Sequence, residues 1–339
     1  MDIETAKGLI DMSYSDLMNG YNRTLNVDGP APFVQVKGFT DLKGIKHGFT
    51  TRLGGVSQGI YESLNMGIHL DDDEEKVLEN YRRIGESMGI DYTRISCPNQ
   101  LHNDNILVVK EEDAGDGITR PLTHENVDAQ ITNVKNLPLI VYAADCVPIL
   151  LADPISRVIG SVHAGWRGTV SGIAAKTVLK MVEEFGCLPE NIHAVIGPSI
   201  SSDNYEVDEN VIKQVYRCNF VDMSDDNIIY NEIEKSNDVW VTCKSGSYTD
   251  GGREIPYNYK GVIQPLPGAS YGIYRTVKFR NRYMLNLWSL NEIILVNAGL
   301  KMSNIYNTRL CTMQNHDLFF SHRYTKGRRG LNAGIISLD

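Results

Sequence analysis

The stretch ADCVPILLADPISRVIGSVHAGWRG, residues 144–168, decides how this chain is expected to fold. Two runs of Val, Ile and Leu lie on either side of Asp153-Pro154, and an Asp followed by a Pro is typical of a tight connection. Apolar runs joined by such a turn predict a β-hairpin. A hairpin centred just after Pro154 places Cys146 directly opposite His163.

Opposite residues of an antiparallel pair share a face, with Cβ atoms about 4.5–5.5 Å apart. That separation suits two side chains that bind one metal ion. The interpretation depends on register, since a slip of one residue would put Cys146 and His163 on opposite faces. The alternative is a core cysteine beside a histidine that is hydrogen-bonded at a strand end.

Strand-like and helix-like segments alternate on both sides of this hairpin. Further strands are expected at 105–110, 137–144 and 192–200. One helix is expected over 72–89, where acidic residues fill the first turn and a glycine ends it, and another over 283–300. A third helix is expected after the hairpin, with Thr169 as its N-cap and Gly186 after its end. The pattern predicts an α/β (α+β layered) fold with a mixed β-sheet core and flanking helices.

The length of 339 residues and an apolar content of 42% allow a large core. Residues 1–32 are expected to be an N-terminal appendage, and residues 33–339 one catalytic domain. Composition turns polar and rich in Gly and Tyr near 221–267, which predicts an insertion there.

A net charge of −9 disfavours nonspecific binding to nucleic acid or to an anionic membrane. The first residues include acidic side chains and no apolar run, so no signal peptide is expected, and residues 137–152 are too short and interrupted to span a bilayer. We therefore expect a cytoplasmic protein. In a cytoplasmic chain of this size, six cysteines without CxxC spacing are expected to be free thiols or metal ligands and not disulfides. The sequence sets no oligomeric state.

A third ligand for the Cys146 and His163 pair would most naturally come from His102, in a polar loop before a predicted strand. Three protein ligands with an open fourth position are what catalytic zinc needs, whereas structural zinc sites usually close with four. By itself, His102 is better explained as a solvated loop histidine.

The hexapeptide HAGWRG, residues 163–168, adds a possible substrate contact. Gly165 and Gly168 permit a tight bend and a close approach of backbone to a ligand. Arg167 precedes a predicted helix N-terminus, a combination that favours an anion. Trp166 would stack on a flat ring or simply pack in the core.

A second anion-binding candidate is FTTRLGGVSQG, residues 49–59, where Arg52 precedes two glycines. Glycine loops can aim several N–H groups at one phosphate. The segment lacks the spacing of a P-loop, so its composition alone favours a plain turn with an exposed arginine.

Taken together, six segments resemble the YfiH family, also called laccase-domain or multicopper polyphenol oxidase proteins and now described as purine nucleoside phosphorylases. The segments are HGFTTRLGGVSQGIYESLNMG, NQLHNDNI, ADCVPILLADP, IGSVHAGWRGTVSGI, IGPSISSDNYEV and RLCTMQNHDLFFSHRYTKGRRG. The resemblance runs from about residue 45 to the C-terminus and implies a single YfiH-like domain. It implies one zinc ion on a histidine, a cysteine and a histidine, which match His102, Cys146 and His163.

The resemblance also implies phosphorolysis: adenosine, inosine, guanosine or S-methyl-5′-thioadenosine reacts with inorganic phosphate to give free base and sugar 1-phosphate. Arg52 is the expected phosphate contact, with Arg167 and the adjacent His322 and Arg323 as lesser candidates. Adenosine deamination is associated with the family too. Nucleobase deaminases pair zinc with a glutamate, and Asp145 could replace it here only if the strand starts after it, since alternation would otherwise aim it away from Cys146.

Three features depart from the family pattern. Asn103 stands where the family usually has a glycine after its first histidine. The segment near 221–267 is longer than the usual connection, and the first 30 or so residues are extra. These features bear on the mouth of the site and leave the ligand trio intact.

Three other functions compete with the zinc enzyme. A copper-dependent, laccase-like polyphenol oxidase would need many imidazoles, typically in HxH pairs, and the chain has eight histidines and no HxH, although two His and a Cys suit a single copper. A non-catalytic binding protein stapled by metal is another reading. A hydrolase with a Cys-His nucleophile is the last, weakened because the resemblance makes Cys146 a ligand.

Overall fold

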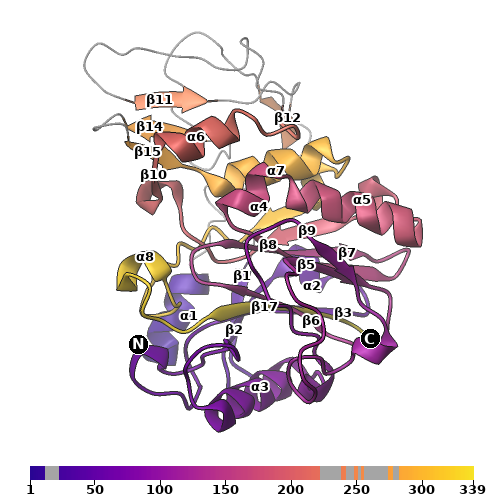
Figure 1. Ribbon diagram of the computed structural model, residues 1–339, viewed down its shortest axis with the longest axis vertical. Helices are drawn as coiled ribbons and strands as arrows, with labels where there is room; N and C mark the ends of the chain where they lie inside the picture. Colours follow the sequence, from indigo (N-terminus) through magenta and orange to yellow (C-terminus); the bar gives the residue numbers. More distant parts are fainter. Residues whose placement is uncertain (12–22, 222–237, 242–247, 251–252, 256–273, 278–281) are drawn as a thin grey trace.

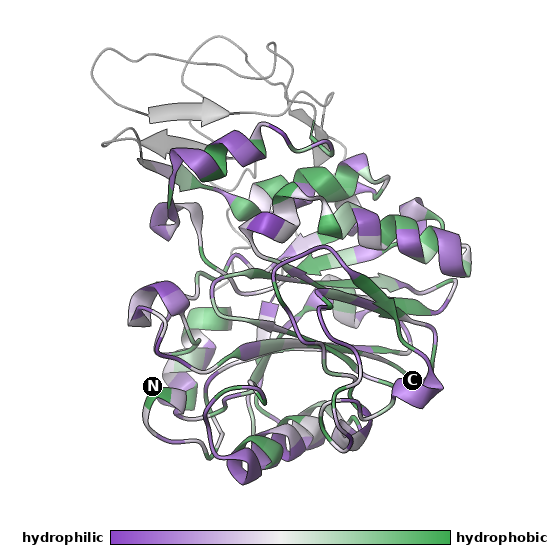
Figure 2. Ribbon diagram, viewed as in Figure 1, coloured by the Kyte–Doolittle hydropathy of each residue, from purple (hydrophilic) through white to green (hydrophobic). Residues whose placement is uncertain are grey.

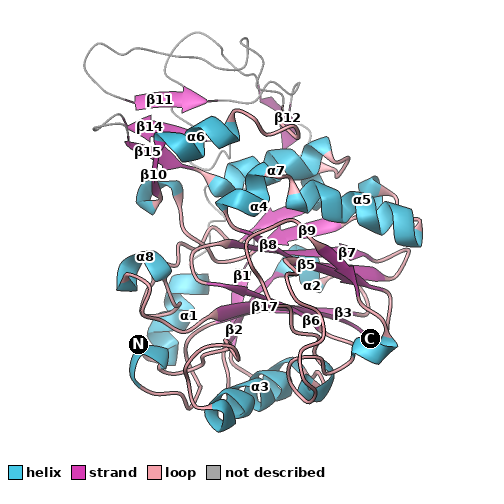
Figure 3. Ribbon diagram, viewed as in Figure 1, coloured by secondary structure: helices cyan, strands magenta, loops and turns pink. Residues whose placement is uncertain are grey.

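The computed structural model describes residues 1–11, 23–221, 238–241, 248–250, 253–255, 274–277 and 282–339. Two large sheets lie face to face in it, and the longer helices cover their outer faces (Figures 1 and 3). The five-stranded sheet has the order β1 (Arg23–Asn26), β2 (Phe33–Val36), β3 (Ile45–Thr50), β17 (Asn332–Leu338) and β6 (Leu139–Ala143). The six-stranded sheet has the order β16 (Ile305–Asn307), β9 (His193–Ile196), β7 (Val147–Asp153), β8 (Val158–Ala164), β5 (Ala129–Thr132) and β4 (Ile106–Val108).

The remaining elements are smaller sheets and the helices. A four-stranded sheet has the order β10 (Glu206–Asp208), β15 (Arg282–Leu285), β14 (Tyr274–Val277) and β11 (Asp238–Val241), and β12 (Tyr248–Asp250) pairs with β13 (Arg253–Ile255). The helices are α1 (Ile3–Asp11), α2 (Lys37–Thr40), α3 (Glu74–Met88), α4 (Trp166–Val170), α5 (Ile173–Phe185), α6 (Glu209–Val215), α7 (Leu287–Asn297) and α8 (His322–Thr325).

Alternation along the strands divides the core into layers. In β17, Ile336 faces the six-stranded sheet, whereas its neighbour Ile335 packs with α3 on the other side. In β7, Leu150 faces the five-stranded sheet, and Ile149 packs with α5 and α7. The strands are therefore buried on both faces, which explains why the sequence around the hairpin reads as continuous apolar runs.

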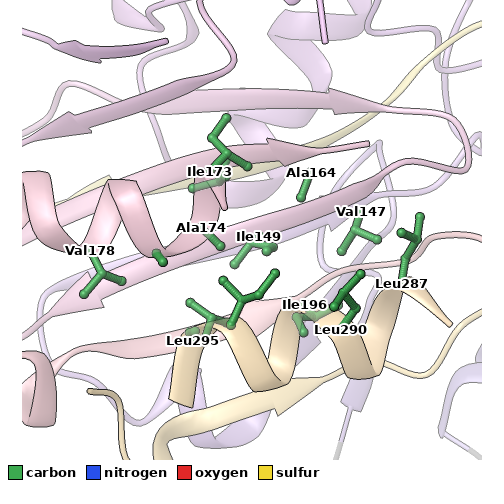
Figure 4. Packing of buried hydrophobic residues seen from close by; sticks show 14 of the residues in the cluster. Val147, Ile149, Ala164, Ile173, Ala174, Val178, Ile196, Leu287, Leu290 and Leu295 are labelled. Atoms are coloured by element: carbon green, nitrogen blue, oxygen red, sulfur yellow. The ribbon is translucent and has the colours of Figure 1, made fainter. Parts of the chain in front are cut away.

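The outer face of the six-stranded sheet is covered by α5 and α7. Figure 4 shows Ile173, Ala174 and Val178 of α5 meeting Leu290 and Leu295 of α7 over the strands. Most of α7 has the green of hydrophobic residues in Figure 2, because it is buried on nearly every side. The predicted fold class is confirmed, and the structure adds that the core holds two stacked sheets.

The predicted hairpin is β7 and β8, but the predicted register is wrong. Pro148, and not Cys146, lies opposite His163, because a four-residue loop joins the strands and Arg157 in it has a φ of 58°. The shift is two residues, which keeps the face of each side chain. Cys146 and His163 are therefore diagonal neighbours on one face.

The predicted helices form, with one wrong cap. Asp73 caps α3 by accepting from the N–H groups of Glu75 and Lys76, and Gly89 ends it in the left-handed conformation. Thr169 is not an N-cap: it lies inside the short α4, and Gly172, at a φ of 77°, separates α4 from α5. The strand β15 occupies the start of the helix predicted over 283–300, which begins only at Leu287.

The N-terminal residues pack on the sandwich. Ala6 and Ile10 of α1 are fully buried, and β1 pairs with β2 at the edge of the five-stranded sheet. Most of the predicted insertion near 221–267 lies outside the described residues. No helix in the described part of the chain combines the length and apolar composition needed to cross a membrane.

Candidate metal centre and its cavity

His102, Cys146 and His163 meet at one end of the sandwich, and one potential ligand atom from each lies within 4.8 Å of the others. His163 is near the end of β8, Cys146 immediately precedes β7, and His102 comes from the loop before β4. The sulfur of Cys146 is 3.8 Å from Nε2 of His102, and the two imidazole rings meet edge to face at 4.7 Å. The convergence predicted from the sequence is confirmed as a possible metal-binding group.

Asp128 positions two of these three side chains, and the sequence reasoning missed it. Its carboxylate accepts from Nδ1 of His163 at 2.6 Å and from the backbone N–H groups of Leu101, His102 and Asn103 at 3.0–3.1 Å. Nδ1 of His163 is thereby engaged, which leaves Nε2 for a metal ion. The same carboxylate holds His102 at a φ of 62° in its loop.

The position of Asp128 follows from the sheet. It directly precedes β5, and the register of β5 with β8 continues through it, so that His163 donates its backbone N–H to the Asp128 carbonyl at 2.7 Å. An acidic residue immediately before an apolar strand, AQIT, was the available signal. The local spacing of ligands gives no such hint, because the two residues are paired only across the sheet.

The pKa values of Cys146 and His163 are shifted in opposite directions. Burial raises the pKa of the Cys146 thiol, but the positive charge of His163 and hydrogen bonds from both histidines outweigh it and lower that pKa to about 6. Burial lowers the pKa of His163, but the Cys146 thiolate and the hydrogen bond to Asp128 raise it to about 9. Without metal the pair is a thiolate beside an imidazolium, so metal binding releases the proton of His163.

We expect Cys146 of the metal-stripped protein to react fast with iodoacetamide at neutral pH. The thiolate is the nucleophile, so a pKa of about 6 makes the rate fall as pH drops through 6 and stay level from pH 7 to 9. Mass spectrometry of the alkylated peptide measures this rate, and zinc should suppress it. Cys187, whose pKa burial raises to about 12, is the unreactive control. A rate that still climbs between pH 7 and 9 would contradict the thiolate assignment.

Gly165 leaves room for the ligands. A Cβ at this position would lie 3.1 Å from Sγ of Cys146 and 3.1 Å from Cδ2 of His102. Either contact is closer than ordinary van der Waals packing, so a side chain here would push the ligands apart. Metal–ligand distances tolerate changes of only about 0.2 Å.

Gly165→Ala is therefore expected to weaken zinc binding by about tenfold without unfolding the protein. Competition with a zinc chelator measures the affinity, and the melting temperature reports the fold. Gly8→Ala is the matched control, since nothing lies within 4 Å of a Cβ there. Unchanged zinc affinity in the Gly165 variant would show that the ligands adjust freely.

A cavity of about 470 Å³ opens beside the possible metal group. It lies where β6 and β8 end and where β7 and β17 begin. Its wall includes His69, Tyr142, Tyr205 and Leu287, so aromatic and apolar surface faces polar groups. The volume falls within the range of about 300–1,000 Å³ that small-molecule sites occupy.

Asp145, expected from the sequence as a catalytic residue, lines this cavity together with His322 and Arg323, the expected substrate contacts. Asp145 accepts from Thr312 Oγ1 and from the Arg323 N–H, each at 2.6 Å, so both of its oxygens are engaged. β7 begins only at Val147, and Asp145 has a φ of 85°, so strand alternation does not turn it away from Cys146. Both side chains border the cavity.

The structure does not bring Arg52, Arg167 or Trp166 to the cavity wall. The Arg52 guanidinium donates to the carbonyls of Glu62 and His316 and lies 4.7 Å from the Phe320 ring centre. The Arg167 guanidinium covers the Trp166 ring at 4.4 Å. Trp166 also packs against the hydrophobic core, which is the second of the two roles expected for it from the sequence.

The structure places another cation, Arg329, in the wall of the cavity. It belongs to the segment TKGRRG and was not among the site residues expected from the sequence. Asn103, the departure from the family pattern, uses its side chain within its own loop, where it bonds to Asn126 and to the N–H of Asn105. The asparagine therefore leaves the trio in place.

Comparison with known proteins gives one consistent result. A family model described as "Multi-copper polyphenol oxidoreductase laccase" matches residues 46–240 and 260–339. The gap between these matches lies inside the segment expected to be an insertion.

Individual relatives agree with that model. The chain is 32% identical to purine nucleoside phosphorylase YlmD of Bacillus subtilis (strain 168), over 87% of this chain and 89% of that protein. It is 27% identical to adenosine deaminase RL5 from an unknown prokaryotic organism, over 86% and 92%. The crystal structure of Bacillus licheniformis hypothetical protein YfiH matches with a TM-score of 0.73 and 28% identity, over 93% and 99%. The chain thus belongs to the laccase-domain family that includes YlmD and YfiH.

Proposed function

We propose that this protein is a zinc-dependent purine nucleoside phosphorylase. The observation that carries the proposal is the His102, Cys146 and His163 group set in the wall of a cavity that is large enough for a small molecule. A relative at 32% identity that is named a purine nucleoside phosphorylase supports the choice of reaction. The proposed substrates are adenosine, inosine, guanosine or S-methyl-5′-thioadenosine, together with inorganic phosphate.

The donor set fits zinc. One thiolate and two imidazoles are typical zinc ligands, and a side left open to a cavity is typical of catalytic rather than structural zinc. The family description names several coppers, but the described residues contain one such group of His, Cys, Asp or Glu side chains. A single copper would fit the same ligands, and a multicopper cluster would not.

In the proposed reaction, an oxygen of phosphate bonds to C1′ of the sugar while the bond from C1′ to the purine nitrogen breaks. The bonding electrons leave with the base, which takes up the proton that the attacking hydrogen phosphate loses, and the sugar keeps the phosphate. When bound, zinc supplies a Lewis acid at the cavity wall. Asp128 orients the His163 imidazole and holds the backbone of His102, and the cavity would align the two substrates.

Deamination of adenosine is a second candidate, because one relative is named an adenosine deaminase. Asp145 is the carboxylate nearest in sequence to the ligands, and it lines the cavity. We propose it as the proton carrier of this side reaction, in place of the glutamate that other nucleobase deaminases use. Its two hydrogen bonds, from Thr312 and Arg323, would hold it ready as an acceptor.

A panel of nucleosides tests both proposals. The zinc-loaded protein is incubated with each nucleoside, with and without inorganic phosphate, and free base and ammonia are measured. Base release that requires phosphate supports phosphorolysis. Ammonia release without phosphate makes deamination the main activity, and oxygen consumption with a phenol after copper loading would support the polyphenol oxidase instead.

A further inference from the structure

The cavity wall contains a cation, Arg329, whose guanidinium has no hydrogen-bond partner among the described residues. It is half-buried, and its Nε is fully buried without a hydrogen-bond partner. No hydrogen bond or ion pair joins its guanidinium to another residue in the described part of the chain. Burial lowers the pKa of this guanidinium, and the negative charges of Cys146 and Asp145 partly oppose that shift.

Other arginines near the site are paired. The guanidinium of Arg52 donates to two backbone carbonyls, and that of Arg323 donates to the Glu206 carbonyl at 3.0 Å. Arg309, which does not line the cavity, also has a buried Nε without a partner, but its Nη2 bonds to the Glu292 carboxylate at 3.0 Å. A buried donor without an acceptor destabilises the folded state, so the unpaired guanidinium of Arg329 indicates an acceptor that arrives from outside.

The charge of the cavity favours an anion as that acceptor. Arg329 and Arg323 bring two positive charges to the wall, and Asp145 brings one negative charge. Zinc on the single thiolate of Cys146 would add a further net positive charge. His322 also lines the cavity, and its pKa is lowered by burial and then by the charge of Arg329, which places the two side chains in one electrostatic environment.

The backbone beside Arg329 is fixed. The N–H of Leu331 donates to Oδ1 of Asn65 at 2.9 Å, and the Leu331 carbonyl accepts from Met66 N–H at 3.0 Å. A Cβ on Gly330 would lie 2.8 Å from the Phe320 ring and 2.9 Å from Asn65 Oδ1, so this position accepts only glycine without rearrangement. The arginine therefore starts from a rigid support, which reduces the entropy lost when a ligand binds.

We propose that Arg329, with His322 beside it, forms the seat for inorganic phosphate. The inference rests on the proposed function and names where its second substrate binds. A guanidinium offers a planar fork of donors that matches two phosphate oxygens, and neutral His322 can donate to a third. This replaces Arg52 as the phosphate contact, because each of its three guanidinium nitrogens donates to a backbone carbonyl and it does not line the cavity.

Arg329→Gln and Arg329→Lys test the seat, with Arg328→Gln as the matched control. Arg328 is adjacent in the chain and exposed, and it does not line the cavity. In the zinc-loaded protein, Arg329→Gln should raise the KM for inorganic phosphate about 10–100-fold and leave the KM for nucleoside within about twofold. Arg329→Lys should fall between, because lysine keeps the charge without the fork. Melting temperatures check that each variant is folded.

A binding measurement separates the seat from the reaction. Calorimetry of inorganic phosphate, and protection of Arg329 from phenylglyoxal by phosphate, require no turnover. If the wild-type protein binds phosphate through Arg329 but cleaves no nucleoside, the proposed function fails and the seat stands. If Arg329→Gln binds inorganic phosphate as tightly as wild type, the seat is wrong. Weaker binding of adenosine 5′-monophosphate with unchanged inorganic phosphate would overturn it too, because Arg329 would then serve the 5′ end of a nucleotide.

Discussion

Replacing Cys146 by serine is expected to lower phosphorolysis by about 100-fold or more while the protein stays folded. A serine hydroxyl remains protonated at neutral pH, so the group would lose its anionic ligand and keep two imidazoles. The thiol lies ahead of β7, outside the three hydrophobic clusters, and it is half-buried. Serine can therefore occupy its place without a core defect.

Zinc content, phosphorolysis rate and melting temperature of Cys146→Ser measure this effect. Cys187→Ser is the control, since Cys187 is a buried free cysteine that does not line the cavity. Full turnover in a zinc-free Cys146→Ser protein would show that the reaction needs no metal. Unfolding of Cys146→Ser together with zinc loss would instead identify a structural metal and a non-catalytic protein.

Asp128→Asn is expected to raise the dissociation constant for zinc about 10–100-fold, the range seen when a partner of a ligating histidine is lost. The amide would present an N–H₂ group to one side of a site where all four partners are donors: the His163 ring and three backbone N–H groups. At least one of them loses its acceptor, and the positions of His102 and His163 become less fixed.

Zinc affinity by chelator competition and the KM-against-kcat split measure the Asp128 effect. If Asp128 positions the ligands, Asp128→Asn should lower kcat even at saturating zinc, because His102 and His163 are held less rigidly. Asp153→Asn is the matched control: Asp153 is also fully buried and accepts from two backbone N–H groups, but at the hairpin turn and away from the cavity. Equal zinc affinity in wild type and Asp128→Asn would remove Asp128 from the machinery of the site.

The sequence was sufficient for the hairpin and for the trio, and insufficient for the register. The length of the turn decides the register, and it depended on Arg157 adopting a left-handed conformation that its residue type does not favour. The error was two residues, so the faces of Cys146 and His163 survived it. A one-residue error would have removed the argument for a shared metal ion.

Tertiary contacts explain the remaining misses. The sequence suggested that Arg52 was free to bind phosphate. One acceptor of its guanidinium is the carbonyl of His316, which is too distant in the sequence to be foreseen. Asp128 and Arg329 carry no local motif: the first acts through a cross-strand partner, and the second becomes notable only because it lacks one. Stacking of two sheets likewise could not be read from apolar runs, because a strand buried on both faces loses its alternation.

The place of β17 has a consequence for how this protein is made. It follows every other strand in the chain, yet it lies between β3 and β6 in the five-stranded sheet. On the ribosome, β3 and β6 emerge long before it and wait with unpaired edges, the kind of nascent surface that chaperones shield. The segment that carries Arg329 directly precedes β17. The pocket beside β17 can therefore form only after this strand has left the ribosome and paired with β3 and β6.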